Sequence, residues 1–219
     1  MAKNRNDTRA VETKQSILDS AATLFASRGF DTVTIREIAR AAGCSHTTIY
    51  LYYKDKLDLL QQLSIPPLIE LEQQMQTILD DGEVTPTEAL HRLSYAFLHF
   101  ALSNRSMYRL FLTVRAGRVD EEHVEMPLNQ LRNQLFAHLR EALRRCFPHA
   151  GTEANLLYTR IYFYMLHGVI ETYLESTEPL DELIKRVAPL LDEALDVVLM
   201  GIQQKAANDE GSTTEGGKQ

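Results

Sequence analysis

The chain has 219 residues, of which 44% are hydrophobic, and its 30 acidic residues outnumber 23 basic ones, which gives a net charge of −7 at pH 7. No stretch approaches the roughly 18 to 20 unbroken apolar residues of a membrane span, and the polar N-terminus lacks the apolar segment of a signal peptide. Only Cys44 and Cys146 are present, so neither a disulfide framework nor a cysteine zinc site is expected. We expect a cytoplasmic protein with one substantial core and a small one.

The chain begins with a polar arm over residues 1–9 that we expect to be flexible, and that suits either a solubilising role or contact with a minor groove. A helix from about Thr8 to Arg28 follows, because apolar residues recur at helical spacing until Gly29. Residues 1–60 carry nine basic and seven acidic residues, a net charge of +2, against 14 basic and 23 acidic residues, a net charge of −9, in the remainder. This charge distribution would orient the N-terminal part of the chain toward a polyanion. We expect the affinity for that polyanion to depend on salt concentration.

Residues 34–56 predict two short helices joined by a tight turn. Thr34 and Glu37 form the pattern of a capping box ahead of an apolar stripe at helical spacing. Gly43 permits a turn with positive φ, and Ser45 can cap the helix that follows. In a helix-turn-helix the second helix lies in the major groove with its first residues at the base edges. The pattern therefore predicts a DNA-reading element.

This segment resembles the TetR family of one-component transcriptional repressors. The family pattern is a helix that ends in an aromatic residue and Gly-(Phe/Tyr), followed by T-x-x-x-I-A-x-x-A-G-V-S-x-G-x-(L/I)-Y-x-(Y/H)-F-x-x-K-x-x-L. The residues at the corresponding positions are Phe25, Gly29, Phe30, Thr34, Ile38, Ala39, Ala42, Gly43, Ser45, Ile49, Tyr50, Tyr52, Tyr53, Lys56 and Leu59. The chain departs from the pattern at Cys44, Thr47, Tyr53 and Leu57, which replace Val, Gly or Pro, Phe, and Glu.

The resemblance, which covers the first quarter of the chain, implies an all-α fold of about nine helices. A three-helix DNA-binding domain would occupy residues 1–55, and a larger ligand-binding and dimerisation domain would occupy residues 56–204. The protein would be a homodimer that binds a palindromic DNA operator.

The resemblance also assigns roles by position. Base edges would be contacted from the start of the second helix by His46, Thr47 and Thr48, and Ser45 lies at its cap. Tyr50 would reach a phosphate or a base, and Tyr52 the wall of the groove. The side chains expected at phosphates are Thr34, Arg36, Lys54 and Lys56.

The rest of the chain predicts helices without sustained strand alternation. A connecting helix should run from Asp55 or Lys56 to about Leu79, kinked or split at Pro66 and Pro67. Further helices are predicted over residues 86–103, 105–116, 127–147, 152–176 and 180–204, the first of them opened by a capping box at Thr85. The polar stretch over residues 205–219 is expected to be disordered.

The last predicted helix carries an apolar stripe wider than one neighbouring helix would cover. In the resembled family the last two long helices of each subunit form a four-helix interface with their symmetry mates. The predicted interface residues are Leu157, Ile161, Gly168, Leu183, Val187, Leu191, Ala194, Leu195 and Val198. The alternative is that the stripe is the core of a single subunit.

The middle helices are rich in aromatic residues with a few polar groups, a composition typical of small-molecule sites. The family has an inducer cavity there, and we expect an apolar or aromatic inducer that moves the two DNA-binding domains apart. The candidate lining residues are Tyr95, His99, Tyr108, Phe111, Arg115, Phe136, Tyr158, Tyr162, Met165, His167 and Glu171.

Two other functions stay open: a regulator that senses oxidation through Cys44, and a helical adaptor without DNA. An enzyme is not expected, because the sequence has no Gly-rich phosphate loop, no H-E-x-x-H motif and no nucleophile beside a base. His167 and Glu171, one helical turn apart, are too few ligands for a firm metal site. No metal or cofactor is therefore expected.

Overall fold

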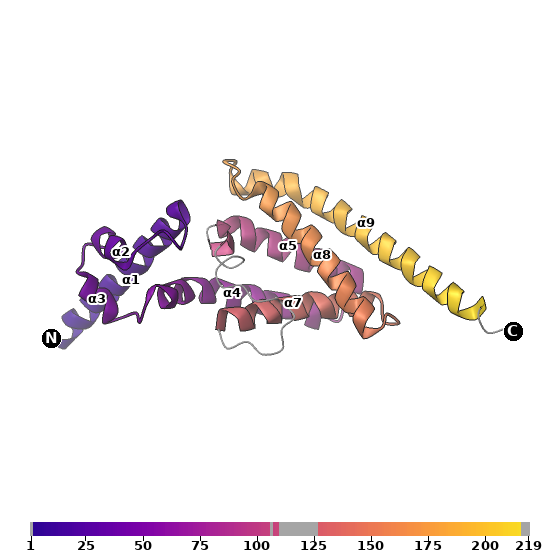
Figure 1. Ribbon diagram of the computed structural model, residues 1–219, viewed down its shortest axis with the longest axis horizontal. Coiled ribbons are helices and arrows are strands. Elements are labelled where there is room, and N and C mark those ends of the chain that lie inside the picture. Colours follow the sequence, from indigo (N-terminus) through magenta and orange to yellow (C-terminus); the bar gives the residue numbers. More distant parts are fainter. Residues whose placement is uncertain (1, 106, 110–126, 216–219) are drawn as a thin grey trace. The chain divides into compact units, whose positions relative to one another are not determined.

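The computed structural model describes residues 2–105, 107–109 and 127–215, with side chains described from Thr8 to Asn208. In these residues the chain forms eight helices and no strand, so the predicted all-α fold is confirmed (Figure 1). Within the same residues no helix has the length and apolar character that a bilayer crossing requires. The helices form two compact units, residues 1–70 with 104–131 and residues 71–103 with 132–219, which we call the N-terminal and C-terminal units.

The N-terminal unit contains α1 (Ala2–Arg28), α2 (Ile35–Ala41), α3 (His46–Tyr50) and the start of α4 (Lys56–Asp80). Gly29 ends α1 with φ +80°, as expected of a glycine that stops a helix. Helices α1, α2, α3 and the start of α4 share one hydrophobic core, whose largest members are Ile17, Phe25, Ile38, Ile49, Tyr53, Leu59 and Leu60. This core holds α2 and α3 against α1.

Two expectations for these helices differ from the structure. The arm over residues 1–9 is helical from Ala2 onward, because this stretch has no Gly or Pro and includes the helix formers Ala, Lys and Arg. Of the two alternatives for the connecting helix, the structure excludes the split, because α4 continues as one helix through Pro66 and Pro67. The two prolines remove backbone donors, yet buried side chains on both sides of them, such as Leu60 and Leu71, hold the helix in place.

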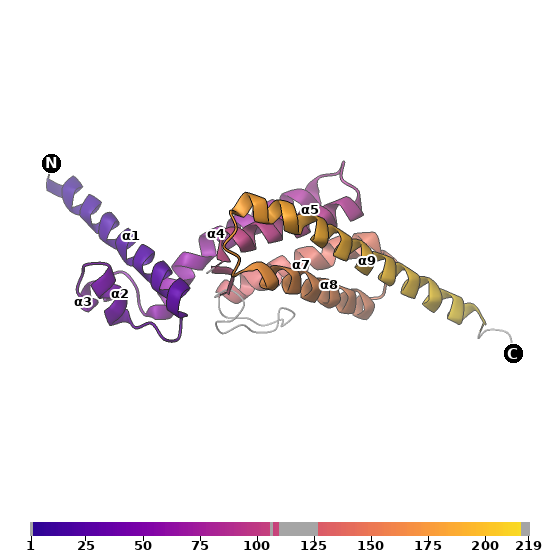
Figure 2. The same cartoon turned by 90° about the horizontal axis from the view of Figure 1, so that it is seen from above.

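The C-terminal unit consists of the end of α4 with α5 (Pro86–Ser103), α7 (Pro127–Cys146) from Arg132 onward, α8 (Thr152–Tyr173) and α9 (Leu180–Glu215). The three helices α5, α8 and α9 pack on one another (Figures 1 and 2). The bounds of α5 are those predicted, and the Thr85 hydroxyl accepts a hydrogen bond from the Glu88 amide at 3.3 Å. The predicted helix over residues 105–116 lies mostly outside the described residues.

Helix α9 extends eleven residues beyond its predicted end at Gln204, so the expectation of disorder from Lys205 is wrong for the backbone up to Glu215. The stretch after Gln204 begins with Lys205, Ala206 and Ala207, which favour a helix. The Gln204 amide also donates to the Asn208 side chain one turn later at 3.2 Å. Residues 216–219 lie outside the described residues.

A histidine ties α5 to α9. The Nδ1 atom of His91 lies 2.9 Å from Asp192 and its Nε2 atom 3.1 Å from Asp196. Both ring nitrogens can donate only in the protonated ring. Burial opposes that charge, but the hydrogen bonds and charges of the two aspartates outweigh it and raise the pKa of His91 above its usual value. The geometry therefore favours the imidazolium form.

We expect the contacts of His91 with Asp192 and Asp196 to make the C-terminal unit more stable at mildly acidic pH. Because the folded-state pKa is raised, the contribution is fully present below the unfolded pKa of about 6.5 and is lost as pH rises through the folded pKa. The contribution of these contacts to the free energy of unfolding is on the order of 1 kcal/mol, as for a partly exposed ion pair. Urea unfolding at pH 5.5 and 8.5 should show a smaller pH effect in His91→Gln than in the wild type. An equal pH effect in both proteins would contradict the assignment.

Candidate nucleic-acid interface

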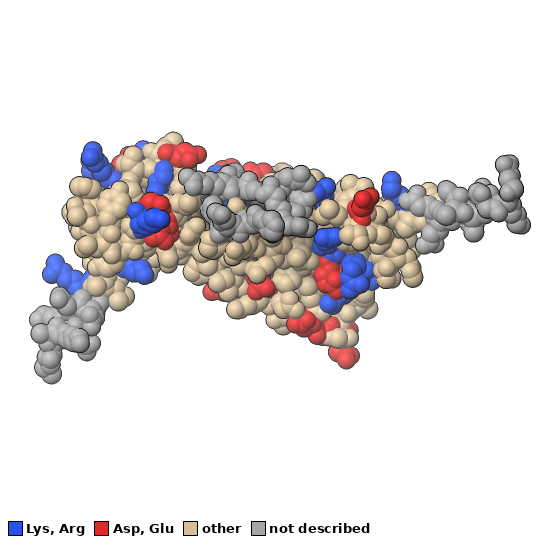
Figure 3. Space-filling view, turned by 60° about the horizontal axis from the view of Figure 1, so that its bottom comes forward, with Lys and Arg blue, Asp and Glu red and all other residues tan. Residues whose placement is uncertain are grey.

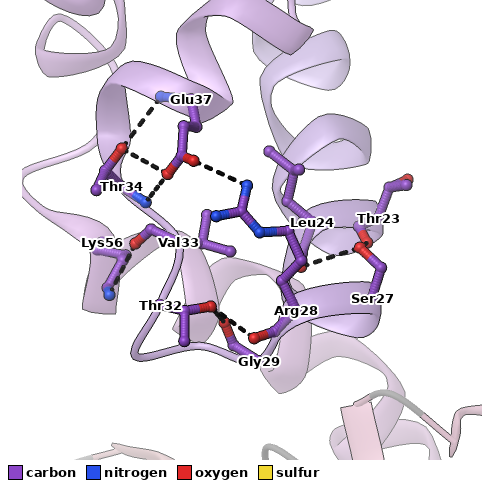
Figure 4. Close-up of polar contacts among 10 residues, drawn as sticks. All are labelled: Thr23, Leu24, Ser27, Arg28, Gly29, Thr32, Val33, Thr34, Glu37 and Lys56. Carbon is purple, nitrogen blue, oxygen red and sulfur yellow. Dashed lines mark hydrogen bonds and ion pairs between the residues drawn. The ribbon is translucent and has the colours of Figure 1, made fainter.

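Helix α2 begins at a complete capping box. The Thr34 hydroxyl accepts from the Glu37 amide at 3.3 Å, and the Glu37 carboxylate accepts from the Thr34 amide at 2.9 Å. Arg28 donates to the same carboxylate at 2.8 Å, which joins α1 to α2 (Figure 4). The hydrogen bonds from Thr34, together with Arg28, lower the pKa of Glu37 to about 2. The carboxylate is therefore charged at neutral pH, and α2 has a fixed start.

The turn between α2 and α3 depends on one glycine and one serine. Gly43 has φ +67°, a conformation that other residues adopt only with strain. Ser45 then caps α3 by accepting from the Thr48 amide at 3.1 Å. Both features were predicted, and together they complete the helix-turn-helix backbone.

Four side chains form the exposed face of α3. His46, Thr47, Tyr50 and Leu51 are all exposed, whereas Ile49 is fully buried in the core. At about 100° per residue, these four positions cover roughly 140° of the helix, on the side away from Ile49. The His46 and Tyr50 rings meet edge to face with centroids 6.5 Å apart. Three of the four residues were predicted to contact DNA, and Leu51 was missed.

Thr48 differs from its predicted place at the base edges. Its side chain is half-buried, and its hydroxyl lies 2.8 Å from that of Ser45. The helical period puts Thr48 on the side opposite the exposed face. Its hydroxyl therefore belongs to the cap of α3.

Lys56 also differs from its predicted place. Its ammonium group donates to the carbonyl oxygens of Phe30 at 2.7 Å, Val33 at 3.0 Å and Asp31 at 3.3 Å (Figure 4 shows the bond to Val33). The nitrogen also lies 4.4 Å from the centroid of the Phe30 ring. Because an ammonium group has three hydrogens, these carbonyls use its full donor capacity. This geometry gives the Lys56 ammonium group a structural role in the loop between α1 and α2, and its predicted phosphate contact would have to replace one of these bonds.

The remaining predicted phosphate ligands are accessible. Arg36 and Lys54 are exposed, and Thr34 is exposed although its hydroxyl serves the capping box. Tyr52 is half-buried against the core of the N-terminal unit. On the face drawn in Figure 3, Lys and Arg side chains are scattered among acidic ones and form no continuous basic patch.

The predicted ligand residues do not all come together. Phe111 and Arg115 lie outside the described residues, and the buried Tyr108 belongs to the N-terminal unit. In the C-terminal unit Tyr158, Tyr162 and Phe136 are buried, Met165 and His167 are half-buried, and Tyr95, His99 and Glu171 are exposed.

An aromatic cluster does form in the C-terminal unit. Phe163 lies at its centre, with its ring stacked on His167 at 6.3 Å and edge-on to Phe136 at 6.0 Å and Phe97 at 6.4 Å. The Tyr162 hydroxyl meets that of Ser94 at 2.6 Å, and burial raises the pKa of Tyr162 far above its usual value. The sequence prediction missed Ser94, although it is a lone polar residue on the apolar face of α5.

An open pocket of about 230 Å³ in the C-terminal unit lies elsewhere, between α7 and α8. None of the predicted ligand residues is among its lining residues, which are Ala137, Arg140, Glu141, Arg144, Ala150, Thr152 and Asn155. In the described part of the chain, no group of three or more His, Cys, Asp or Glu residues is placed to hold a metal ion.

The predicted dimer residues separate into two groups. Leu183, Val187, Leu191 and Leu195 are buried within a single chain, so their assignment to a subunit interface is wrong. They fill the side of α9 that faces the rest of its own unit. Leu157, Ile161 and Gly168 of α8 are exposed, and Ala194 and Val198 are half-buried.

Large apolar side chains remain exposed on the last two helices. We call this set the outer stripe; its members, 44% to 66% exposed, are Leu157, Ile161 and Tyr164 of α8 and Leu190, Val197 and Met200 of α9. The sequence prediction included only the first two of them. Their spacing places each set of three on one side of its helix.

Cys44 lies at the turn before α3 and is half-buried. Burial raises the pKa of its thiol above the usual value. Because the thiolate is the form that oxidants attack, a raised pKa disfavours the alternative of an oxidation sensor at this position.

Comparisons with known proteins agree with this geometry. Residues 17–63 match the family described as bacterial regulatory proteins, tetR family, and residues 90–198 match the tetracyclin repressor-like C-terminal domain. The HTH-type transcriptional regulator AcrR of Shigella flexneri is 27% identical over 78% of this chain and 83% of its own length. The HTH-type transcriptional repressor BepR of Brucella suis is 39% identical over 27% of this chain and 28% of its own length.

Solved structures show the same fold. A TetR-family transcriptional regulator from Bordetella parapertussis matches with a TM-score of 0.64 at 24% identity, over 81% of this chain and 92% of that one. Members of the matched family are DNA-binding transcriptional regulators and not enzymes. The chain belongs to the TetR family of transcriptional regulators.

Proposed function

We propose that the protein is a cytoplasmic repressor that binds a palindromic operator as a homodimer and releases it when a small apolar or aromatic molecule binds the C-terminal unit. The observation that carries this proposal is the exposed face of α3, held outward by the buried Ile49 and by caps at Ser45 and Thr34. A rigid helix with polar side chains on its exposed face fits the major groove of DNA. The repressor role is supported by BepR, which is named a transcriptional repressor.

The outer stripe supports the homodimer. Six exposed large apolar residues on two packed helices are more than scattered surface residues would explain. An isologous two-fold contact would cover the same stripe on both copies, and it would present two α3 helices to half-sites one helical turn of DNA apart.

The aromatic cluster around Phe163 supports an inducer of apolar or aromatic character. Stacked and edge-on rings can separate to admit a flat, apolar molecule between them. To release DNA, the inducer must bind the DNA-free arrangement of the dimer more tightly. A tenfold preference corresponds to about 1.4 kcal/mol.

Binding to DNA is tested first by selecting duplexes from a random pool with the wild-type protein. Fluorescence anisotropy then measures affinity for the selected operator, for each single base-pair change, and for unrelated duplex. The proposal expects a palindromic consensus and an operator affinity well above that for unrelated duplex. The proposal is wrong if the protein binds all duplexes with the same affinity, or if it binds no duplex.

We expect His46→Ala to lower sequence discrimination at one base-pair position of each half-site. A lost base contact of this kind costs about 1–3 kcal/mol at that position. Arg36→Ala serves as the control, because loss of a phosphate contact should weaken operator and unrelated duplex by the same factor. The single-change operators of the binding assay measure both effects. Identical profiles for the two variants would contradict these roles.

The release mechanism has a separate test. Compounds that raise the melting temperature of the protein are titrated calorimetrically with and without operator. Operator should lower the affinity of the protein for the inducer, and inducer should lower its affinity for the operator. Thermodynamic linkage requires that these two factors are equal. If the ligand binds free and operator-bound protein with equal affinity, it does not control the release of DNA, and this part of the proposal is wrong.

A further inference from the structure

The outermost apolar side chain of the DNA-binding element has no assigned role. Leu51 is 76% exposed, more than any other large hydrophobic residue in the described part of the chain. A single exposed leucine is ordinary on a protein surface. Leu51, however, directly follows Tyr50, which is itself 54% exposed, and it completes the exposed face of α3.

The backbone holds Leu51 in a fixed place. It is the C-cap of α3, and its amide donates to the Thr48 carbonyl at 3.2 Å. Ile49 and Tyr53, two residues to either side, are buried in the core, and the Tyr53 amide donates to the Ile49 carbonyl at 2.9 Å. The leucine is therefore presented by a rigid turn and not by a loose loop.

Leu51 lies on the same side of the helix as Thr47, four residues earlier. His46 and Tyr50 form the neighbouring row, and Leu51 is the one aliphatic side chain among these four residues of the exposed face. The leucine side chain can neither donate nor accept a hydrogen bond. In the major groove the one apolar group on a base edge is the 5-methyl group of thymine.

We propose that Leu51 reads a thymine methyl group in each half-site of the operator and so determines part of the sequence specificity. This inference rests on the proposed function, since it needs α3 in the major groove. Loss of one methyl contact corresponds to about a fourfold loss of affinity for each half-site. Two symmetric half-sites give roughly a 15-fold loss.

The test replaces each thymine of the selected operator by deoxyuridine, symmetrically in both half-sites. This change removes only the methyl group and leaves the hydrogen-bonding edge intact. For the wild-type protein, one position should show roughly the 15-fold loss by fluorescence anisotropy. Leu51→Ala should bind the thymine and uracil operators with affinities within about twofold, because the contact is already absent.

Thr47→Ser is the matched control, because it removes the other exposed methyl group on this row and keeps the hydroxyl. It should retain the preference for thymine at the Leu51 position. The inference is overturned if no uracil substitution weakens wild-type binding, if the preference survives in Leu51→Ala, or if it disappears in Thr47→Ser alone. Failure of the wild type to bind any selected duplex would instead overturn the proposed function, and this inference with it.

Discussion

Replacing Ile161 and Val197 together by glutamate is expected to separate the dimer into single chains and to weaken operator binding at least about 100-fold. Both residues belong to the outer stripe and are exposed in a single chain, so glutamate costs the fold little there. In an isologous contact each substitution occurs twice, which would bury four carboxylates without partners. Such a burial costs several kcal/mol, and 3 kcal/mol is already more than a 100-fold change.

Sedimentation equilibrium measures the first effect, since the variant should have the 24.9 kDa mass of one chain and the wild type twice that mass. Circular dichroism checks that both remain helical. The control is Gln203→Glu, which adds the same charge to α9 at an exposed position about 120° around the helix from Val197. This control should remain a dimer and bind operator normally. A double variant that stays dimeric would show that the outer stripe is not the interface.

The burial of α9 shows why the sequence could predict an interface but not its residues. Apolar residues cover much of the circumference of this helix, and both the core of its own unit and a symmetry mate could use them. The stripe through Leu183, Val187, Leu191 and Leu195 is the more regular one and packs inward. Leu190, Val197 and Met200 are spaced irregularly, seven and three residues apart, so their shared exposure becomes visible only once the packing of α5 and α8 is known.

The helix-turn-helix could be predicted closely because its signals are local. The capping box at Thr34, the positive φ of Gly43 and the cap at Ser45 each depend on residues within three positions of one another. The contacts of Lys56 depend on carbonyls 23 to 26 residues away, and no local pattern indicates them. The resemblance to the family pattern predicted a phosphate contact for Lys56. In the structure, three carbonyl oxygens of the same chain accept hydrogen bonds from its ammonium group instead.

Replacing Lys56 by methionine is expected to destabilise the N-terminal unit and to leave the salt dependence of operator binding unchanged. Methionine keeps an apolar stem against Phe30 but removes all three hydrogen bonds to the loop over residues 30–33. Hydrogen bonds from a charged donor contribute about 1.5–3 kcal/mol each, but water can reach part of this loop. We expect a net loss of about 2–3 kcal/mol, visible as faster hydrogen exchange in α2 and a lower melting temperature.

Lys54→Met is the matched control, because Lys54 is exposed and two residues away. It should leave stability unchanged and, if each subunit loses one phosphate contact, lower the slope of log affinity against log salt by about 1.8 for the dimer. The two lysines are thus expected to give opposite results in the two assays. If Lys56→Met lowered the salt slope and left the melting temperature and exchange rates unchanged, Lys56 would be a phosphate ligand and its contacts with the loop would contribute nothing to the fold.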